Sequence, residues 1–487
     1  MILRVLFLFL VCGAATAEEG RLGRVQATLP EIDRMYAELA AKEHLPGLIY
    51  GVVLDGKLVH SKAYGLANVE RQLPPTTATR FRIASMSKSF VAMAALRLRD
   101  EGKLRLDDPV ARYLPELSTL RLPTSDSPTL TIRHLMSMST GLPQDDPWGD
   151  RQMEMQEAEL ARFVAGGLSF SNAPGSYYEY SNLGYVMLGR IVTKVAGMRF
   201  QDYVTQHIFQ PLGMKDTTWE YASVPADQLA LGYRWTGQGW EVEPMLHDGA
   251  AAAMGGVLTT LDDFARYVAF HLNAWPARDG ADTGPVRRAT VREMQLPKML
   301  AGSTPTAGLT NFYSFGMRSS VNAKGMFDVG HSGGLPGFGS QYRLAPEQGI
   351  GIIAFSNLRY GPVYQPTISA LATLVARAVL PARAVPPSPV LLQRQQQLVE
   401  LIQHWDPALA AAVTADNFFL DRSRADWIAD TKDLLGKVIS VGPLKADNLL
   451  RGSFVLTGEH GALKVSFTLT PEKDPKVQEL NLLSAKL

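Results

Sequence analysis

Two predicted β-hairpins at distant points of the chain constrain its fold more than any other feature. Residues 47–63 form two β-rich runs around Asp55-Gly56, a dipeptide that strongly favours a tight hairpin turn. Residues 340–355 show a similar pattern around a turn that contains Pro346. Because the two hairpins lie near opposite ends of one region, we expect a single antiparallel sheet that both ends of that region complete.

Predicted helices flank the two hairpins and fill the region between them. The helix over residues 85–101 is apolar all round from Phe90 to Leu96, so we expect it to be buried, and Gly102 ends it. Further helices are predicted at residues 29–42, 182–196, 260–272 and 367–380. The fold class is therefore α+β, with an antiparallel sheet flanked by helices and a separate helical subdomain.

A proline-rich stretch at residues 381–390 predicts a stiff linker to a second domain. Beyond it, we expect a small α+β accessory domain over residues 391–487, similar to the NTF2-like or cystatin-like kind. Its predicted helices span residues 391–405 and 407–418, and its predicted strands span residues 450–457, 463–469 and 477–483.

Residues 1–17 have the pattern of a cleaved secretory signal peptide: a charged start, a short apolar run and a small-x-small site ending at Ala17. We therefore expect a periplasmic or secreted protein that is at most peripheral to a membrane. Cys12, the single cysteine, lies inside this segment, so the mature chain would have neither disulfides nor thiol chemistry. The net charge of +1 gives no reason to expect a nucleic-acid partner.

The residues Ser85-Met86-Ser87-Lys88 place a hydroxyl and an amine one helical turn apart at the start of the buried helix. Backbone amides at a helix start favour developing negative charge on Ser85. Burial disfavours a charged ammonium, so Lys88 is a candidate proton acceptor. The motif is short, and a capping serine beside an exposed lysine is the competing interpretation.

The residues Tyr180-Ser181-Asn182 precede the helix predicted at 182–196. A tyrosine hydroxyl near a lysine loses its proton more readily, so Tyr180 is a candidate base. The side-chain amide of Asn182 offers both a donor and an acceptor, which suits a substrate amide. A simple helix cap is an equally good interpretation.

The glycine-rich run Gly330-His331-Ser332-Gly333-Gly334 also matches the Gly-x-Ser-x-Gly pattern of α/β-hydrolases. That pattern needs a strand, a sharp turn and a helix, whereas the run here is followed by Pro336 and then by a predicted strand. The same glycines fit a strand edge that a bound substrate approaches closely.

In this order and spacing, the three motifs resemble the serine β-lactamase and penicillin-binding-protein superfamily, and most of all its class C β-lactamase-related branch. The resemblance covers roughly residues 25–380 and implies a β-lactamase/transpeptidase-like domain there. Shorter stretches that also resemble the family lie at residues 106–110, 132–135, 141–142, 211–214 and 255–257.

The resemblance implies roles for the motif residues. Ser85 is the acylated nucleophile, Lys88 and Tyr180 share the proton transfers, and Tyr180 activates the deacylating water. Asn182 holds the substrate amide. The backbone N–H groups of Ser85 and Gly334 form an oxyanion hole. Substrate-binding residues are then Asn182, His331, Ser332, Gly333 and Gly334.

One position departs from the family pattern, because His331-Ser332 stands where the family has Lys-Thr. A histidine is only partly charged near neutral pH, which puts β-lactam binding in doubt. We expect His331 to orient the leaving side of the substrate. No metal-ligand spacing is present, so neither a metal nor a cofactor is expected.

The leading hypothesis is an exported serine hydrolase that forms an acyl-enzyme with an amide or ester, such as a D-amino-acid peptide, a β-lactam or a carboxylic ester. The expected partner is a small-molecule or peptide substrate, with cell-wall fragments among the candidates. The alternatives are a slow-turnover penicillin-binding or sensor protein on the same fold, a cell-wall binding protein dominated by the accessory domain, and an α/β-hydrolase-type esterase with Ser332 as nucleophile.

Overall fold

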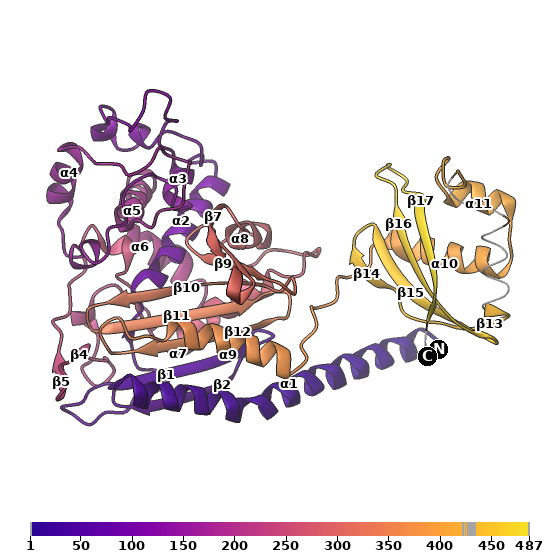
Figure 1. The fold of residues 1–487 in the computed structure, drawn as a ribbon, viewed down its shortest axis with the longest axis horizontal. Helices are drawn as coiled ribbons and strands as arrows, with labels where there is room; N and C mark the ends of the chain where they lie inside the picture. Colours follow the sequence, from indigo (N-terminus) through magenta and orange to yellow (C-terminus); the bar gives the residue numbers. More distant parts are fainter. Residues whose placement is uncertain (1, 421–422, 424, 426–434, 486–487) are drawn as a thin grey trace. The chain divides into compact units, whose positions relative to one another are not determined.

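The computed structural model describes residues 2–420, 423, 425 and 435–485. The chain divides into two compact units (Figure 1). The first comprises Met1–Trp275 and Gly280–Ala382, and the second comprises Pro276–Asp279 and Arg383–Leu487.

The first unit is built on an eight-stranded antiparallel sheet with the order β2-β1-β12-β11-β10-β9-β8-β7. Both predicted hairpins are confirmed, and strand β1 pairs with β12, so the two ends of the unit meet in one sheet. Asp55 and Gly56 form the first turn with φ angles of 47° and 85°. The strands are β1 Gly47–Leu54, β2 Lys57–Gly65, β7 Met299–Thr304, β8 Leu309–Tyr313, β9 Arg318–Asn322, β10 Phe327–Leu335, β11 Phe338–Ala345 and β12 Ile350–Ser356.

Helices cover both faces of this sheet, as its alternating side chains require. On β1, Tyr50 and Val52 pack into a core shared with helices α1 (Ile2–Lys42) and α9 (Tyr364–Arg377). Ile49 and Val53 point the other way, into the larger core that holds α7 (Leu261–Asn273) and α2 (Lys88–Asp100). Figure 1 shows α1 and α9 running along one face of the sheet.

The helical region beside the sheet contains the predicted buried helix, with one correction at its start. Residues 84–87 form a separate 3₁₀ turn, η1 (Ala84–Ser87), and the α-helix begins only at Lys88. The predicted helix at 182–196 is confirmed as α5, and α9 ends three residues earlier than predicted, at Arg377. The remaining elements are α3 Ile132–Met136, α4 Glu157–Ala165, α5 Asn182–Ala196, α6 Phe200–Val204, α8 Arg288–Gln295, β3 Phe81–Arg82, β4 Tyr233–Trp235, β5 Trp240–Val242 and β6 Leu258–Thr259.

The second unit packs helices α10 and α11 with a five-stranded antiparallel sheet around its own apolar core. The helix predicted at 407–418 ends at Val413, because Thr414 leaves the helix to bridge Val477. Two short strands, β13 and β14, were not predicted. The elements are α10 Pro389–Gln403, α11 Pro407–Val413, β13 Val438–Val441, β14 Lys445–Asn448, β15 Arg451–Gly458, β16 Gly461–Leu469 and β17 Val477–Ala485.

Across the part of the chain that the structure describes, no helix combines the length and the apolar character needed to cross a bilayer.

Candidate active site

Ser85 and Lys88 lie side by side where η1 meets α2. The Ser85 side chain is partly exposed, whereas Lys88 is fully buried. The ammonium group of Lys88 donates to Ser85 Oγ at 2.9 Å, to Asn182 Oδ1 at 2.7 Å and to the backbone oxygen of Met254 at 2.6 Å. These three acceptors match the three donors of a lysine ammonium, so the amine is held in one place beside the hydroxyl.

The turn that carries Ser85 is tightly constrained by strand β10. Ala84, just before the nucleophile candidate, has a φ of 48°, a left-handed conformation that costs an L-residue about 1–2 kcal/mol. Gly333 of β10 lies directly against it, because a Cβ at that position would come within 2.2 Å of the Ile83 oxygen. The Ser340 hydroxyl of the neighbouring strand donates to the same oxygen at 2.8 Å. The packing of the sheet therefore holds Ser85 in position.

The environment of Lys88 prepares it for proton transfer. Burial lowers the pKa of the amine to about 8, and the nearby carboxylates of Asp146, Asp150 and Asp145 partly oppose this shift. A neutral amine is therefore present in a large fraction of molecules at mildly alkaline pH. The structure excludes the interpretation of Lys88 as an exposed surface lysine.

Tyr180 joins the same site from the turn before α5. Its ring centroid lies 5.0 Å from Lys88 Nζ and 6.2 Å from the ring of His331. Burial raises the pKa of its hydroxyl well above the ordinary value, although a hydrogen bond with Ser85 acts in the opposite direction. The lowering of this pKa that the sequence led us to expect is not seen, so Tyr180 stays a neutral phenol near pH 7.

The glycine-rich run forms the second half of strand β10. Strand β9 pairs with β10 only as far as Gly330, and His331, Ser332, Gly333 and Gly334 continue beyond it. This half-strand passes the Ser85 turn and then joins β11 in a hairpin. The strand–turn–helix geometry of an α/β-hydrolase nucleophile is therefore absent at Ser332, which lies within the strand.

His331 is buried and its hydrogen bonds define its tautomer. Nδ1 lies 2.5 Å from the Ser332 carbonyl oxygen, which can only accept, so Nδ1 carries the proton. Nε2 then accepts from the Tyr313 hydroxyl at 3.1 Å. Burial, with the positive charge of Arg318, lowers the pKa of His331 well below its ordinary value. The ring is neutral, not partly charged as the sequence predicted.

Arg318, which sequence reasoning did not find, brings a positive charge close to His331. The guanidinium lies over the Tyr180 ring at 5.2 Å and over the Tyr178 ring at 5.8 Å. Its Nε atom is buried and has no hydrogen-bond partner within the described ranges. Because Arg318 opens a short strand without any motif around it, only the pairing of β9 with β10 reveals its place.

Three aspartates from one loop form an acidic group beside Asn182, and sequence reasoning missed them too. Asp145 accepts the backbone N–H groups of Asn182 and Leu183 at 2.7 and 2.8 Å, which caps α5. Asp146 accepts from Asn182 Nδ2 at 2.5 Å. Asp150 is buried, which together with the charge of Asp146 raises its pKa to about 7. Asp150 therefore carries a proton in a large fraction of molecules near neutral pH.

No group of three or more histidine, cysteine, aspartate or glutamate side chains is arranged to hold a metal ion among the residues that the structure describes.

Comparison with known proteins shows which family has this arrangement of residues. A family model described as Beta-lactamase matches residues 32–377. The chain belongs to the beta-lactamase family. The match includes Ser85, Lys88, Tyr180 and the β10 run, and it identifies the first unit as a serine hydrolase fold of the β-lactamase and penicillin-binding-protein superfamily.

Relatives within this family are distant. Protein flp of Staphylococcus aureus (strain MW2) is 29% identical over 333 residues, which are 67% of this chain and 63% of that protein. Beta-lactamase-like protein 2 of Dictyostelium discoideum is 30% identical over 344 residues, or 69% of this chain and 60% of that protein. The matches thus span under two thirds of either relative.

Solved structures show the same beta-lactamase fold. An octameric penicillin-binding protein homologue from Pyrococcus abyssi superposes with a TM-score of 0.61 at 22% identity, covering 93% of this chain and 95% of that one. A class C beta-lactamase mutant superposes with a TM-score of 0.57 at 22% identity, covering 73% and 96% of the two chains. At this level of identity, both superpositions show a shared fold.

The ionisation of Lys88 should control the reactivity of Ser85. We expect the second-order rate of labelling by a fluorophosphonate to rise with pH and to level off above a midpoint near 8, because only the neutral amine accepts a proton. Labelling rates between pH 5.5 and 10 measure this midpoint. A midpoint near 6 to 6.5, typical of a histidine, would contradict the assignment.

The acidic group of Asp145, Asp146 and Asp150 should affect the pH midpoint of Ser85 labelling. In Asp150→Asn the Lys88 ammonium loses a stabilising negative charge, so its pKa falls and the labelling midpoint moves to lower pH. The same pH series measures the shift, with Asp227→Asn, an exposed aspartate, as the charge-matched control. A midpoint that stays in place or rises in Asp150→Asn would show that the acidic group does not act on Lys88.

Proposed function

We propose that this protein is an exported serine hydrolase that turns over amides or esters through an acyl-enzyme on Ser85. The observation that carries the proposal is the buried Lys88 amine, 2.9 Å from Ser85 Oγ, with its pKa lowered to about 8. A serine hydroxyl is a weak nucleophile unless an adjacent base takes its proton, and Lys88 meets that need.

In the acylation step, neutral Lys88 accepts the Ser85 proton while Oγ attacks the carbonyl carbon of the substrate. The carbonyl oxygen becomes an oxyanion, which the backbone N–H groups of Ser85 and Gly334 stabilise. One such donor is worth on the order of a hundredfold or more in rate. Asn182 orients the acyl part of the substrate, and the free half of β10 aligns it along the strand.

Tyr180 completes the proton transfers as a neutral phenol. It receives the proton from Lys88 as it gives its own to the leaving oxygen or nitrogen, and the bond from the carbonyl carbon to that atom breaks. In deacylation, water attacks the ester carbon and gives its proton to the Lys88–Tyr180 pair. Ser85 Oγ leaves and recovers a proton. The hydrolysed acid and the resting enzyme result.

Arg318 favours a substrate that carries a negative group on its leaving side. We also assign His331 the role of orienting that side of the substrate. A guanidinium on a partly buried side chain suits a carboxylate, such as that of a β-lactam or of a peptide ending in a D-amino acid. Uncharged carboxylic esters would bind without this contact.

A slow-turnover penicillin-binding or sensor protein is the second candidate, because the Asn182 Nδ2 donor is already engaged by Asp146. A substrate carbonyl would have to share the amide nitrogen with that carboxylate. Repeated turnover of any ester by the folded protein, at a rate well above that of a denatured control, would exclude the sensor role.

Ser85→Ala should remove hydrolysis of p-nitrophenyl esters, with a loss on the order of a thousandfold or more, because the nucleophile is gone. Ser332→Ala should keep activity within about tenfold, since Ser332 only lines the strand edge. Steady-state kcat/KM values for both variants test this. Hydrolysis that survives in Ser85→Ala and is lost in Ser332→Ala would move the nucleophile to Ser332.

Export by a cleaved leader remains part of the proposal and rests on residues 1–17. Expression of the full chain in a Gram-negative host should give a periplasmic protein whose N-terminus is Glu18, as read by N-terminal sequencing. Recovery only from the cytoplasm with an intact Met1 would contradict it.

A further inference from the structure

A single hydrogen bond links the two sides of the active site. The hydroxyl of Tyr360, in the turn between β12 and α9, donates to Asp150 Oδ2 at 3.0 Å. Asp150 lies in the short turn η4 (Gly149–Arg151), on the loop that runs beside Asn182. The proposed function places the substrate between Asn182 and the free half of β10. This bond therefore spans the place of the substrate, although none of the proton transfers uses it.

Tyr360 lies against β10 on the side opposite the Ser85 turn. A Cβ at Gly334 would come within 2.9 Å of Tyr360 Cδ1. A Cβ at Gly333 would instead meet the Ile83 oxygen, just before the Ser85 turn. Neighbouring residues of a strand point to opposite faces, so the edge of β10 lies between that turn and the tyrosine ring. The N–H of Gly334 is a proposed oxyanion donor, so a substrate carbonyl bound to it lies beside Tyr360.

The backbone of Tyr360 is strained. Its φ of 47° lies in the left-handed region, which an L-residue adopts only where its surroundings impose it, as at ligand clamps and switches. Its N–H donates to the Leu335 oxygen at 3.2 Å, where β10 turns into β11. The side chain is nevertheless 40% exposed. The strand therefore fixes the backbone, while the ring stays accessible to an entering ligand.

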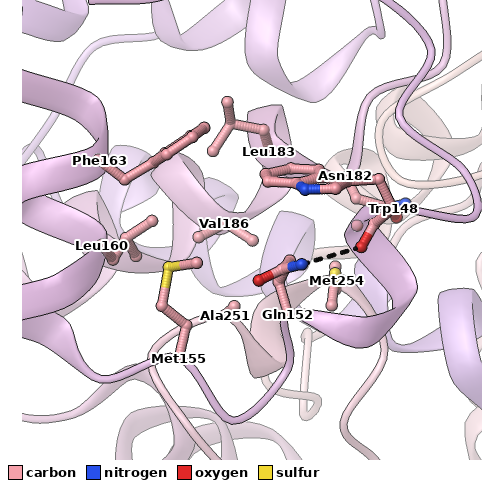
Figure 2. Close-up of a pocket in the computed structure, with 11 residues that line it drawn as sticks. Trp148, Gln152, Met155, Leu160, Phe163, Asn182, Leu183, Val186, Ala251 and Met254 are labelled. Carbon is pink, nitrogen blue, oxygen red and sulfur yellow. Dashed lines mark hydrogen bonds between the residues drawn. The ribbon is translucent and has the colours of Figure 1, made fainter. Parts of the chain in front are cut away.

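The loop that carries Asp150 is braced against its neighbours. Figure 2 shows the Gln152 side chain bonded to the Trp148 backbone oxygen, at 3.3 Å. A Cβ at Gly149 would come within 3.0 Å of Asn182 Nδ2. Asp150 itself is only 4% exposed. Because the aspartate is buried on a braced loop, the contact opens by rotation of the exposed tyrosine side chain.

The same bond affects the charge of Asp150. Burial and the charge of Asp146 raise the pKa of Asp150 to about 7, and the hydrogen bond from Tyr360 acts in the opposite direction. Burial, with the charge of Asp150, raises the pKa of the Tyr360 hydroxyl well above its ordinary value, so it remains a donor at alkaline pH. When the bond opens, the Asp150 pKa rises further and the carboxyl takes up a proton at neutral pH.

A proton on Asp150 changes the field at Lys88. The charged groups that act on Asp150, Tyr360 or Lys88 are Asp145, Asp146, Arg151 and Arg318, together with Asp150 and Lys88 themselves. Among them, the Asp150 carboxylate favours the ammonium form of Lys88. If Asp150 becomes neutral, more of the Lys88 amine is neutral at a given pH. The amine then accepts the Ser85 proton more readily.

We propose that the Tyr360–Asp150 hydrogen bond is a strap across the active site, which an entering substrate opens and whose opening removes a negative charge from beside Lys88. Tyr360 is then a positioning residue that acts on Ser85 through Asp150 and Lys88. The empty enzyme is the less reactive form, and displacement of the tyrosine by a substrate gives the more reactive one. The proposal rests on the function proposed above and adds regulation of the same site.

Labelling of Tyr360→Phe by a fluorophosphonate tests the strap, because this change removes the hydroxyl and keeps the ring against Gly334. The pH midpoint of labelling should fall below the wild-type value near 8, as in Asp150→Asn. The double variant should shift no further than Asp150→Asn alone, because the charge has already gone. At pH 10, where Lys88 is neutral, the labelling rate of Tyr360→Phe should exceed that of the wild type by about two- to tenfold, since no bond has to open.

Tyr113→Phe is the matched control. The Tyr113 hydroxyl also donates to an aspartate, at 2.6 Å from Asp108 Oδ2, and neither residue is part of the active site. This variant should keep the wild-type midpoint and rate. A midpoint in Tyr360→Phe that stays in place or rises would overturn the proposal, as would an unchanged rate at pH 10 or a further shift in the double variant.

A direct titration of Asp150 separates the strap from the chemistry. In Ser85→Ala protein with ¹³C-labelled aspartate carboxyl groups, NMR should show an Asp150 signal, identified by its absence in Asp150→Asn, that titrates near pH 7. Adding Tyr360→Phe should move this titration to higher pH. If no protein is labelled at Ser85 but this shift occurs, the strap stands and the proposed function fails. Labelling without the shift would overturn the strap alone, and absence of both would overturn both.

Discussion

The buried amine of Lys88 is the interaction on which the rest of the site depends. An ammonium taken out of water is costly unless every donor is paired, and here Ser85 Oγ, Asn182 Oδ1 and the Met254 oxygen provide the three acceptors. Those acceptors come from three separate segments of the chain. The same burial that makes the charge expensive makes the amine a usable base near pH 8.

The fold holds these segments together through close backbone contacts. Strand β10 passes so near the Ser85 turn that position 333 has room only for glycine. Beyond Gly330 the strand has no β9 partner, and its free edge lies beside the nucleophile. Arg318, at the start of β9, brings positive charge to this part of the site.

Much of this arrangement could be predicted from the sequence, because local patterns carry it. The Asp55-Gly56 turn, the alternating hairpin strands and Gly102 after the helix that follows Ser85 each follow from short-range chemistry. The three motifs identified the residues that the structure brings together. Their pairing into one sheet followed from the positions of the hairpins.

The parts that could not be predicted depend on distant neighbours. Arg318 becomes important only because β9 pairs with β10, and the charge of His331 is set by burial and by Arg318 rather than by its own motif. The pKa of Tyr180 rises because burial and the neighbouring Tyr313 outweigh the lowering by Ser85 and Arg318, a balance that no spacing reveals. Asp150 looks like a surface residue in sequence, yet the fold buries it beside Asp146.

The most direct test of the central claim is to locate the covalent intermediate. Acid quenching during turnover of a p-nitrophenyl ester, followed by tryptic digestion and fragmentation by mass spectrometry, separates the peptide of residues 83–88 from that of residues 325–343. An acyl mass on Ser85 in the first peptide, absent from the peptide of residues 83–97 that Lys88→Met gives instead, is the result that a lysine-activated serine predicts. An acyl group on Ser332, or on Ser85 at an undiminished rate without Lys88, would contradict it.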